Sequence, residues 1–224
     1  VPRASELLEL VHSDVCGPFQ PSITGDRYFT VFIDDHSRRV QVYFLKTKDQ
    51  LFDIFKQFKA LAETETGHKI KALRTDNGGE YESTAFKDYL AVSGIKHQTS
   101  APYTPQQDGK SERVIRSLME IARPMMRQTN MSAGFWPYAV ATAAYLKNRA
   151  PHKMLDHKTP HEVWTGTKPE VSHLGVLGCD AYVLVPDNQR NKLDSKSKRC
   201  TFLGYMHDDG QLAYRLYDPA TKRV

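Results

Sequence analysis

Three acidic residues, Asp14, Asp76 and Glu112, have the types and spacing needed to gather carboxylates around divalent metal ions. Asp76 follows Asp14 by 62 positions, and 35 residues separate Asp76 from Glu112. Carboxylate oxygens are preferred ligands of Mg²⁺ and Mn²⁺. Two such ions can activate water or a hydroxyl against a phosphodiester and stabilise the leaving oxygen. The pattern therefore predicts metal-dependent phosphodiester chemistry.

The three acids lie in different predicted elements. Asp14 comes late in an apolar, strand-like run over residues 6–16, and Asp76 ends a predicted strand over residues 69–75. Glu112 falls in the first turn of a predicted helix, where an acid also complements the helix dipole. A buried, unpaired carboxylate in a strand is costly, which makes Asp14 hard to explain structurally. Two strand ends and one helix can bring these acids to one point.

Basic residues around Glu112 favour contact with phosphate groups. Arg116 lies four residues after Glu112 and shares its helix face, while Lys110 and Arg113 flank Glu112. The alternative is that Glu112 and Arg116 form only a surface ion pair, worth ~0.3–0.5 kcal/mol. Guanidinium and ammonium groups beside a metal-binding carboxylate suit a nucleic-acid backbone. We therefore interpret Lys110, Arg113 and Arg116 as candidate DNA contacts.

Residues 99–109 contain two prolines and are predicted to form an exposed loop before this helix. Long loops beside a site are more often functional than decorative. Tyr103 and Gln106 from this loop are further candidate DNA contacts. Asp34 and Asp35 are interpreted as residues of a hairpin turn, and Glu80 as a solvated loop residue.

Composition agrees with a polyanionic partner. The net charge is +5 and the isoelectric point is about 9.0. Three cysteines without a Cys-x-x-Cys pair favour neither a disulfide framework nor a zinc knuckle. No apolar run reaches ~18 residues, so no membrane span is predicted. We expect a soluble, intracellular protein. The basic stretch from Arg190 to Arg199 is either a second DNA contact or simply a solvated surface.

The predicted elements alternate in a way typical of an α/β fold. Three strands come first, followed by helix, strand, helix, strand and helix, which indicates one mixed sheet with flanking helices. Further strands are predicted over 28–33, 39–45 and 95–98, and a helix over 135–149. Capping boxes at 47–50 and 159–162 mark predicted helix starts, and Gly67, Gly94 and Pro124 mark predicted helix ends.

The character of the sequence changes beyond about residue 170. Short strands are predicted over 179–185, 200–205 and 214–217, around a polar, basic segment. We therefore predict two domains. Residues 1–168 form the core with its helical extension, and residues 169–224 form a small β-rich module that we expect to be truncated.

Several motifs resemble those of the integrases of Ty1/copia-type LTR retrotransposons. They are His12-Ser13-Asp14, Phe32-Ile33-Asp34-Asp35-His36-Ser37-Arg38, Asp76-Asn77-Gly78-Gly79-Glu80-Tyr81, Pro102-Tyr103-Thr104-Pro105-Gln106-Gln107, Ser111-Glu112-Arg113, Asn148-Arg149-Ala150-Pro151 and Phe202-Leu203-Gly204-Tyr205. The gap of 35 residues also matches the D,D-35-E arrangement of the retroviral integrase superfamily. The resemblance covers essentially the whole chain.

The resemblance implies an RNase H-like core with a mixed five-stranded sheet. It implies that Asp14, Asp76 and Glu112 are the catalytic residues and hold two Mg²⁺ or Mn²⁺ ions. The implied reactions are processing of the 3′ ends of element DNA and transfer of the 3′-hydroxyl into target DNA. The implied assembly is a homo-oligomer, a dimer or larger, acting in the nucleus after assembly in cytoplasmic virus-like particles.

The chain also departs from the family pattern. Asp108 stands where an asparagine is usual, and Pro124 replaces a more helix-compatible residue. We do not expect this chain to include the zinc-binding domain that normally precedes the core. We expect a fragment of a polyprotein product. Two alternatives stay open: a decayed or domesticated integrase-like module that binds DNA or assembles without catalysis, and a host RNase H-like nuclease. The complete acidic triad argues against the first, and the Tyr-Thr-Pro-Gln loop argues against the second.

Overall fold

The computed structural model describes residues 3–76, 78–99, 105–208 and 211–224, without the side chains of residues 105–108, 207–208 and 211. Its main sheet has five strands in the order β3-β2-β1-β4-β5. They are β1 (Val11–Cys16), β2 (Tyr28–Asp34), β3 (Val40–Leu45), β4 (Ala72–Thr75) and β5 (Lys96–Thr99). β1 pairs antiparallel with β2 and parallel with β4. The predicted α/β fold with a mixed five-stranded sheet is confirmed.

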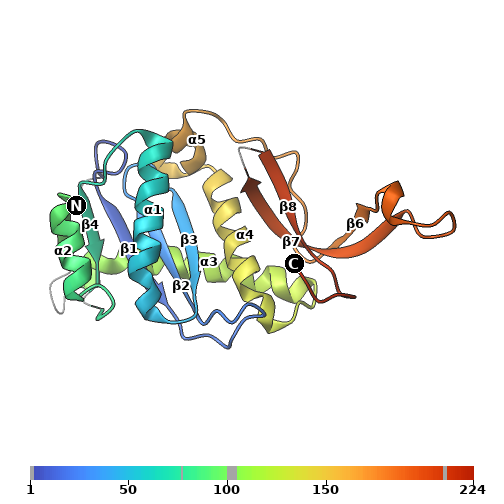
Figure 1. Ribbon diagram of the computed structural model, residues 1–224. Coiled ribbons are helices and arrows are strands. Elements are labelled where there is room, and N and C mark those ends of the chain that lie inside the picture. Colours follow the sequence, from blue (N-terminus) through green and yellow to red (C-terminus); the bar gives the residue numbers. More distant parts are fainter. Residues whose placement is uncertain (1–2, 77, 100–104, 209–210) are drawn as a thin grey trace.

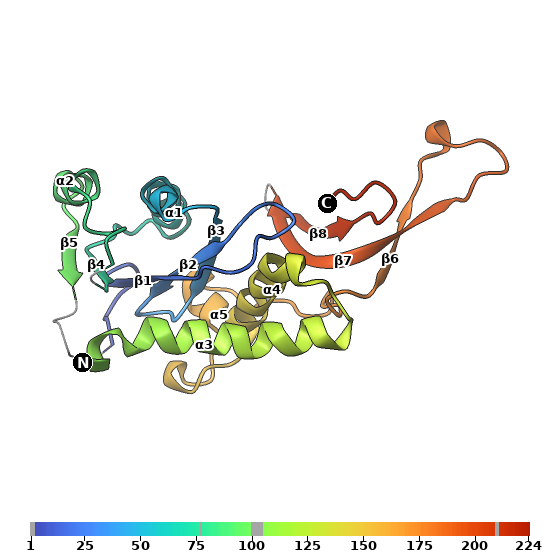
Figure 2. The same cartoon turned by 90° about the horizontal axis from the view of Figure 1, so that it is seen from below.

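Helices cover both faces of this sheet (Figure 2). The helices are α1 (Leu51–Thr66), α2 (Thr84–Val92), α3 (Pro105–Gln128), α4 (Trp136–Arg149) and α5 (Pro160–Thr165), with short 3-10 turns at Lys48–Gln50, Ala133–Phe135, Lys153–Leu155 and Asp187–Gln189. Side chains of α1 and α2 pack in one core cluster, and those of α3 and α4 pack in another.

Strand β2 explains how the two clusters share one sheet. Phe29, Val31 and Ile33 belong to the cluster with α3 and α4, whereas Phe32 belongs to the cluster with α1 and α2. Successive side chains of a strand point to opposite faces, so a strand with a helix layer on each side is apolar throughout. The ring of Phe32 stacks on Phe58 of α1 with 4.2 Å between centroids.

Local sequence signals set the ends of α1 and α5 as predicted. The Gln50 side chain accepts hydrogen bonds from the Lys46 and Thr47 backbone amides, at 2.7 and 3.3 Å. Gly67 ends α1 in the left-handed conformation, with φ of 71°. Thr159 Oγ1 accepts a hydrogen bond of 3.0 Å from the Glu162 amide at the start of α5.

The predicted starts of β1 and of α3 are wrong. The strand predicted from residue 6 begins at Val11, because Leu8 has a φ of 60° and its amide donates to Asp34 Oδ1 instead of to a strand. Residues 105–109, predicted as loop, are the start of α3, with Pro105 at a position where a missing amide hydrogen costs nothing. Glu112 therefore lies about two turns inside the helix.

Helix α3 also passes Pro124 and continues to Gln128. Pro124 is exposed, while Leu118 and Ala122 are buried against the sheet. An interior proline costs ~3 kcal/mol, whereas each large apolar side chain that is fully buried contributes about 1.5–3 kcal/mol. Met125 and Met126, directly after Pro124, pack against the same cluster, so packing on both sides of the proline outweighs the predicted break.

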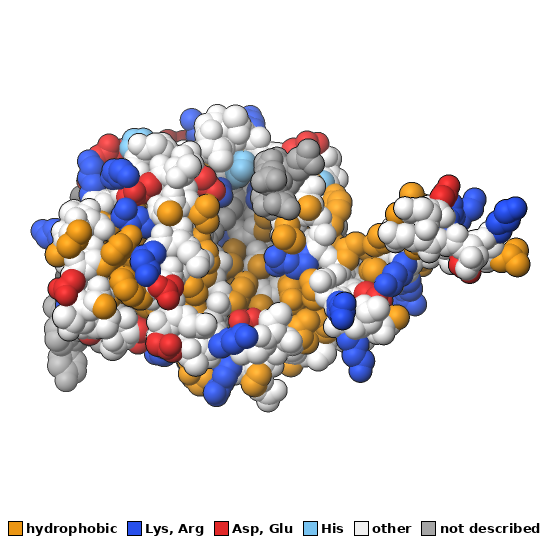
Figure 3. Space-filling model, in the orientation of Figure 1, with side chains coloured by type: hydrophobic (Ala, Val, Ile, Leu, Met, Phe, Trp, Pro, Cys, Tyr) orange, Lys and Arg blue, Asp and Glu red, His pale blue; other side chains and the backbone are white. Residues whose placement is uncertain are grey.

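A second sheet has the order β6-β7-β8, with β6 (Asp180–Leu184), β7 (Ser197–Asp208) and β8 (Gln211–Tyr217). Tyr205 of β7 stacks on Tyr145 of α4 at 4.2 Å. Gly204 allows this approach, since a Cβ there would lie 2.7 Å from Thr142 Oγ1. β6 and the start of β7 project from the body as an arm (Figure 1), on which basic and apolar side chains are exposed (Figure 3). The domain boundary at residue 168 stays a prediction.

Candidate metal and nucleic-acid site

The sheet register places Asp14 and Asp76 side by side. β1 and β4 pair in parallel with Val11 opposite Leu73 and His12 opposite Arg74. Carried two positions further, this register sets Asp14 beside Asp76, and neighbouring strands lie ~4.8 Å apart. Asp14 Oδ1 accepts a hydrogen bond of 2.7 Å from the Val15 amide, and Asp76 Oδ1 accepts one of 3.0 Å from the Gly78 amide. Both carboxylates are thus oriented by their own backbone.

Glu112 meets Asp14 across a shared pocket. Helix α3 runs along the sheet close to β1 (Figure 2), and between them lies a pocket of about 460 Å³. It is lined by Asp14, Val15, Cys16, Phe19, Glu112, Ile115, Arg116, Met119, Glu120 and Arg123. One acid of the predicted triad comes from β1 and one from α3.

The three triad carboxylates do not form a closed metal cage. Within the described residues, which include all three acids, no group of three or more His, Cys, Asp or Glu side chains is close enough to hold a metal ion. The donor set is nevertheless the right one for Mg²⁺ or Mn²⁺, since every member offers carboxylate oxygens. Carboxylates repel one another at short range, so we expect the three side chains to approach one another only when a cation binds between them.

Tyr81 fixes the segment that carries Asp76, a role that sequence reasoning missed. Its ring is fully buried, and its hydroxyl lies 2.7 Å from Ser13 Oγ, next to Asp14. Its amide donates to the Gly78 carbonyl at 3.0 Å, which closes the turn after Asp76. Burial raises the pKa of the Tyr81 hydroxyl, so it stays protonated. The sequence signal was a lone aromatic residue directly after a Gly-rich turn.

Glu80 is not the solvated residue that was predicted. Its side chain is only 8% exposed and pairs with Lys48 Nζ at 2.9 Å. A Cβ on Gly78 would lie 2.9 Å from Asp76 Oδ1 and 3.0 Å from Glu80 Oε2. The absence of a side chain at Gly78 therefore lets the two carboxylates lie close together.

Asp34 and Asp35 are both buried, and their roles differ. Asp34 is the predicted turn residue, because its Oδ2 accepts hydrogen bonds from the Ser37 amide and hydroxyl, at 2.7 and 2.6 Å. Asp35 Oδ1 lies 3.1 Å from His12 Nε2, 2.8 Å from an Arg38 nitrogen and 2.6 Å from Lys110 Nζ.

Asp35 therefore joins β1, the β2–β3 turn and α3. Burial alone would raise the pKa of its carboxyl group. The hydrogen bonds from His12 and Lys110, helped by the Ala4 amide and the charge of Arg38, instead hold that pKa far below its usual range.

The predicted DNA contacts fall into three groups. Arg113 and Arg116 are exposed on α3, and Arg116 lines the pocket with Glu112. In the described part of the chain no ion pair forms between Glu112 and Arg116. The Lys110 ammonium is paired with Asp35, which was not foreseen. Tyr103 lies outside the described residues, as does the side chain of Gln106.

Sequence reasoning also missed Arg123, which lines the pocket seven residues after Arg116. Seven residues are two helical turns, so the helical period was the signal that could have found it. In the second basic stretch, Arg190 pairs with Asp187, Lys198 with Asp218, and Arg199 with Asp180 at 2.9 Å. These pairs neutralise much of the charge that suggested a second DNA contact.

The three cysteines are free thiols, with Cys16 half-buried, Cys179 exposed and Cys200 buried. Burial, together with the negative charge of Asp14, raises the pKa of Cys16 to about 11. Within the described residues, none of the helices is both long enough and apolar enough to cross a membrane.

Comparisons with known proteins find two matching domain families. Residues 5–105 match the integrase core domain, and residues 179–224 match the retroviral polymerase SH3-like domain. The Pol polyprotein of transposon TNT 1-94 from Nicotiana tabacum is 49% identical over 223 residues, which are 99% of this chain and 17% of that polyprotein. The Pol polyprotein of transposon RE2 from Arabidopsis thaliana is 38% identical over 202 residues, 90% of this chain and 14% of its own length.

Solved structures of viral integrases share the fold. The simian T-cell lymphotropic virus intasome, solved with PP2A regulatory subunit B56 gamma, aligns with a TM-score of 0.61 at 16% identity, over 96% of this chain and 78% of that one. The catalytic core domain of HTLV-2 integrase, solved with magnesium in a trimeric form, aligns with a TM-score of 0.54 at 18% identity, over 72% and 99%. The chain is thus similar to an integrase core domain over residues 5–105, to a retroviral polymerase SH3-like domain over residues 179–224, and to a segment of the Pol polyproteins of plant retrotransposons.

Proposed function

We propose that this chain supplies the catalytic core of a retrotransposon integrase. The core would process the 3′ ends of element DNA and transfer the resulting 3′-hydroxyl into target DNA, with Asp14, Asp76 and Glu112 as catalytic metal ligands. The observation that carries the proposal is the pocket that Asp14 and Glu112 share; the parallel pairing of β1 with β4, extrapolated two positions, supports Asp76 as their neighbour.

The residues of the pocket have separate roles in this proposal. Bound Mg²⁺ or Mn²⁺ would lower the pKa of the attacking water or hydroxyl and stabilise the leaving oxygen. The Val15 and Gly78 amides hold one oxygen of Asp14 and of Asp76, respectively, in a fixed direction. Arg116 and Arg123 offer guanidinium groups to the phosphates of a DNA strand. Tyr81 ties the Asp76 turn to β1.

Assembly and place of action belong to the same proposal. The chain would act as a homo-oligomer on element-end and target DNA, in the nucleus. An intasome and a trimeric core are described among the solved structures with this fold. Light scattering of the chain with and without a branched DNA substrate tests the assembly, which should grow when the DNA is added.

The decisive experiment compares Glu112→Gln with wild type in a disintegration assay on a branched oligonucleotide, with and without Mn²⁺. Glutamine keeps the size of the side chain but removes the negative charge, so activity should fall at least ~100-fold, the scale on which single transition-state contacts act. DNA binding and the melting temperature should change little. Undiminished strand transfer by this variant would show that Glu112 is not a metal ligand.

Glu120→Gln is the matched control. Glu120 lies on the same helix and lines the same pocket, but it stands outside the proposed triad. It should keep most of the wild-type activity. Equal losses in both variants would assign the effect to the total charge of the pocket and not to Glu112.

A second candidate, a module that binds DNA without catalysis, is favoured by one observation. The described carboxylates do not gather closely enough for a metal ion. Calorimetric titration with Mn²⁺ separates the two: the catalytic core should bind Mn²⁺ with its DNA substrate and lose that binding in Glu112→Gln. A chain that binds DNA in the same way with and without Mn²⁺, and cuts nothing, would support the second candidate.

A further inference from the structure

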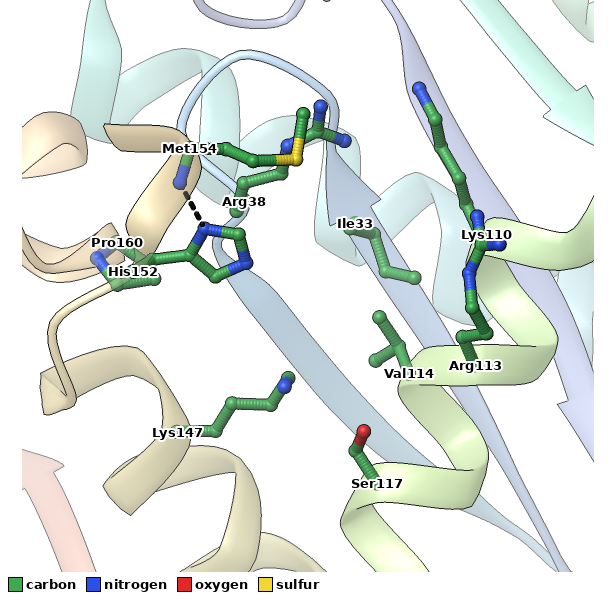
Figure 4. A pocket seen from close by; sticks show the side chains of 10 residues that line it. All are labelled: Ile33, Arg38, Lys110, Arg113, Val114, Ser117, Lys147, His152, Met154 and Pro160. Carbon is green, nitrogen blue, oxygen red and sulfur yellow. Dashed lines mark hydrogen bonds between the residues drawn. The ribbon is translucent and has the colours of Figure 1, made fainter. Parts of the chain in front are cut away.

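Helix α3 carries a second pocket on its other side. Neighbouring residues of a helix are ~100° apart around its axis, so Glu112 lines the pocket shared with Asp14 while Arg113 lines the second pocket. This second pocket has a volume of about 320 Å³ (Figure 4). It is lined by Ile33, Arg38, Lys110, Arg113, Val114, Ser117, Lys147, His152, Met154 and Pro160. We call it the basic pocket.

The basic pocket has an excess of positive charge. Arg38, Lys110, Arg113 and Lys147 contribute four formal charges, and no acid is among the lining residues. The carboxylate that pairs with two of them is that of Asp35, which is fully buried. At neutral pH the cluster therefore keeps about three positive charges. Concentrated charge of one sign in a concave, partly enclosed site attracts an ion of the opposite sign.

Lys147 is the clearest sign that the pocket is built for a ligand. Its side chain is half-buried, yet within the described residues its ammonium group forms no ion pair or hydrogen bond. Burial lowers the pKa of Lys147, which shows that the charge is held there at a cost. Figure 4 shows the side chain reaching from α4 toward the centre of the pocket.

Two more groups are left open toward an anion. The Met154 amide donates to His152 Nδ1 at 3.2 Å, so the other ring nitrogen carries the hydrogen and faces the pocket (Figure 4). The Ser117 hydroxyl lies on the facing side of the pocket. Nitrogen-bearing side chains from the β2–β3 turn, α3, α4 and the segment before α5 thus surround one space.

We infer that the basic pocket binds a terminal phosphate monoester, the group shared by a 5′-phosphorylated DNA end and a free nucleoside monophosphate. A monoester carries about −1.5 to −2 charges at pH 7 and offers three acceptor oxygens. A phosphodiester inside a strand carries one negative charge. The three net positive charges of the cluster therefore suit the monoester better. This site lies apart from the triad, so the inference goes beyond the proposed catalysis.

Size and lining agree with a phosphate that enters with part of its sugar. A water occupies ~30 Å³ of liquid, so the pocket has room for about ten waters. Ile33, Val114, Met154 and Pro160 give it apolar walls. Such walls lower the local dielectric constant and strengthen the attraction between donor groups and an anion.

The test is calorimetric titration of the full 224-residue chain, in EDTA to keep the triad free of metal. The titrants are a short duplex with one 5′-phosphate, the same duplex with a 5′-hydroxyl, thymidine 5′-monophosphate and thymidine. The phosphorylated duplex should bind about tenfold tighter than its hydroxyl form, as expected when charge-assisted hydrogen bonds are gained. Thymidine should not bind.

Lys147→Met identifies the pocket. This variant should lose the preference for the 5′-phosphate, while Lys168→Met, at an exposed lysine outside the pocket, should keep it. Without ligand, Lys147→Met should melt no lower than wild type, because it removes a half-buried charge that has no partner. His152→Gln, which keeps a polar side chain, should also weaken the preference and guards against a folding defect in the first variant.

Each result of these titrations either supports or overturns the proposed phosphate site. Binding of thymidine 5′-monophosphate without preference between the duplexes supports the site and names the free nucleotide as its source. A preference between the duplexes that vanishes in Lys147→Met supports the site and names the DNA end. Equal affinity for both duplexes together with no binding of the monophosphate overturns the inference, as does a preference that survives in both Lys147→Met and His152→Gln. None of these results depends on catalysis.

Discussion

Asp14 lies in β1 and Asp35 directly follows the neighbouring strand β2, yet the two aspartates have different surroundings. Asp35, directly after β2, is fully buried and held by His12, Arg38 and Lys110. Asp14, in β1, is partly exposed and lines the pocket that also contains Glu112. The difference indicates that the surroundings of a carboxylate determine whether it can stabilise the fold or bind a ligand. One that is enclosed by cations holds elements together, whereas one that opens onto a pocket keeps access to a ligand.

The largest expected effect is the loss of stability in Asp35→Ala. Removing one member of a buried charged cluster leaves the others uncompensated, which typically costs about 3–5 kcal/mol. Urea unfolding should show this loss in the free energy of unfolding. Asp88→Ala, on the exposed side of α2, is the control and should stay within about 0.5 kcal/mol of wild type. An Asp35→Ala variant as stable as the control would abolish the distinction between the two aspartates.

The next effect is on activity in Asp14→Asn. The variant should fold with a stability close to wild type and lose at least ~100-fold in strand transfer, because the amide cannot replace an anionic metal ligand. Both quantities are measured on one preparation, by urea unfolding and by the disintegration assay. If Asp14→Asn lost stability and activity in proportion, Asp14 would be a structural residue like Asp35.

The smallest effect is the pH dependence of stability, which separates the partners of Asp35. Burial lowers the pKa of His12 below its usual value, although Asp35 opposes that shift. The unfolded chain then binds more protons than the folded one around and below pH ~6.5, so stability falls as the pH falls. The contribution of Asp35, whose pKa is held low, is present above pH ~3.9 and is lost only at more acid pH.

Urea unfolding of wild type between pH 7.5 and 5 should therefore show a decline, and His12→Asn should flatten it. His97 and His152, whose pKa values are also lowered chiefly by burial, account for a residual slope. A decline that is unchanged in His12→Asn would mean that His12 does not titrate with unfolding in this range.

The sequence predicts those features that depend on neighbours along the chain. The apolar run of β2, the capping box before α1 and the stop at Gly67 are local patterns, and each of them is found where it was expected. The parallel pairing of β1 with β4 then directs Asp14 and Asp76 to the same edge of the sheet, which an alternation of strands and helices could only suggest.

Features that depend on distant partners could not be predicted in this way. Glu80 is shielded by Lys48, 32 positions away, and Lys110 is drawn to Asp35 across 75 positions. The basic pocket combines residues of the β2–β3 turn, α3, α4 and the segment before α5. Proline-rich spacing favoured a loop over residues 105–109, whereas α3 begins at Pro105. Contacts between residues far apart in the sequence determine these features, and such contacts produce no pattern within a short stretch of sequence.

Pro124 in α3 has a consequence for local opening of the helix. Proline has no amide hydrogen, so the carbonyl of Glu120 lacks its usual helical donor, and the ladder of hydrogen bonds has a gap there. Opening of the last turn, up to Gln128, therefore breaks one hydrogen bond fewer. Because the ladder is interrupted at Pro124, this opening is poorly coupled to opening of the preceding turns. Amide hydrogens after Pro124 should exchange with solvent faster than those near Leu118. Fraying of the C-terminal end of α3 should therefore leave the half of the helix that carries Glu112 folded.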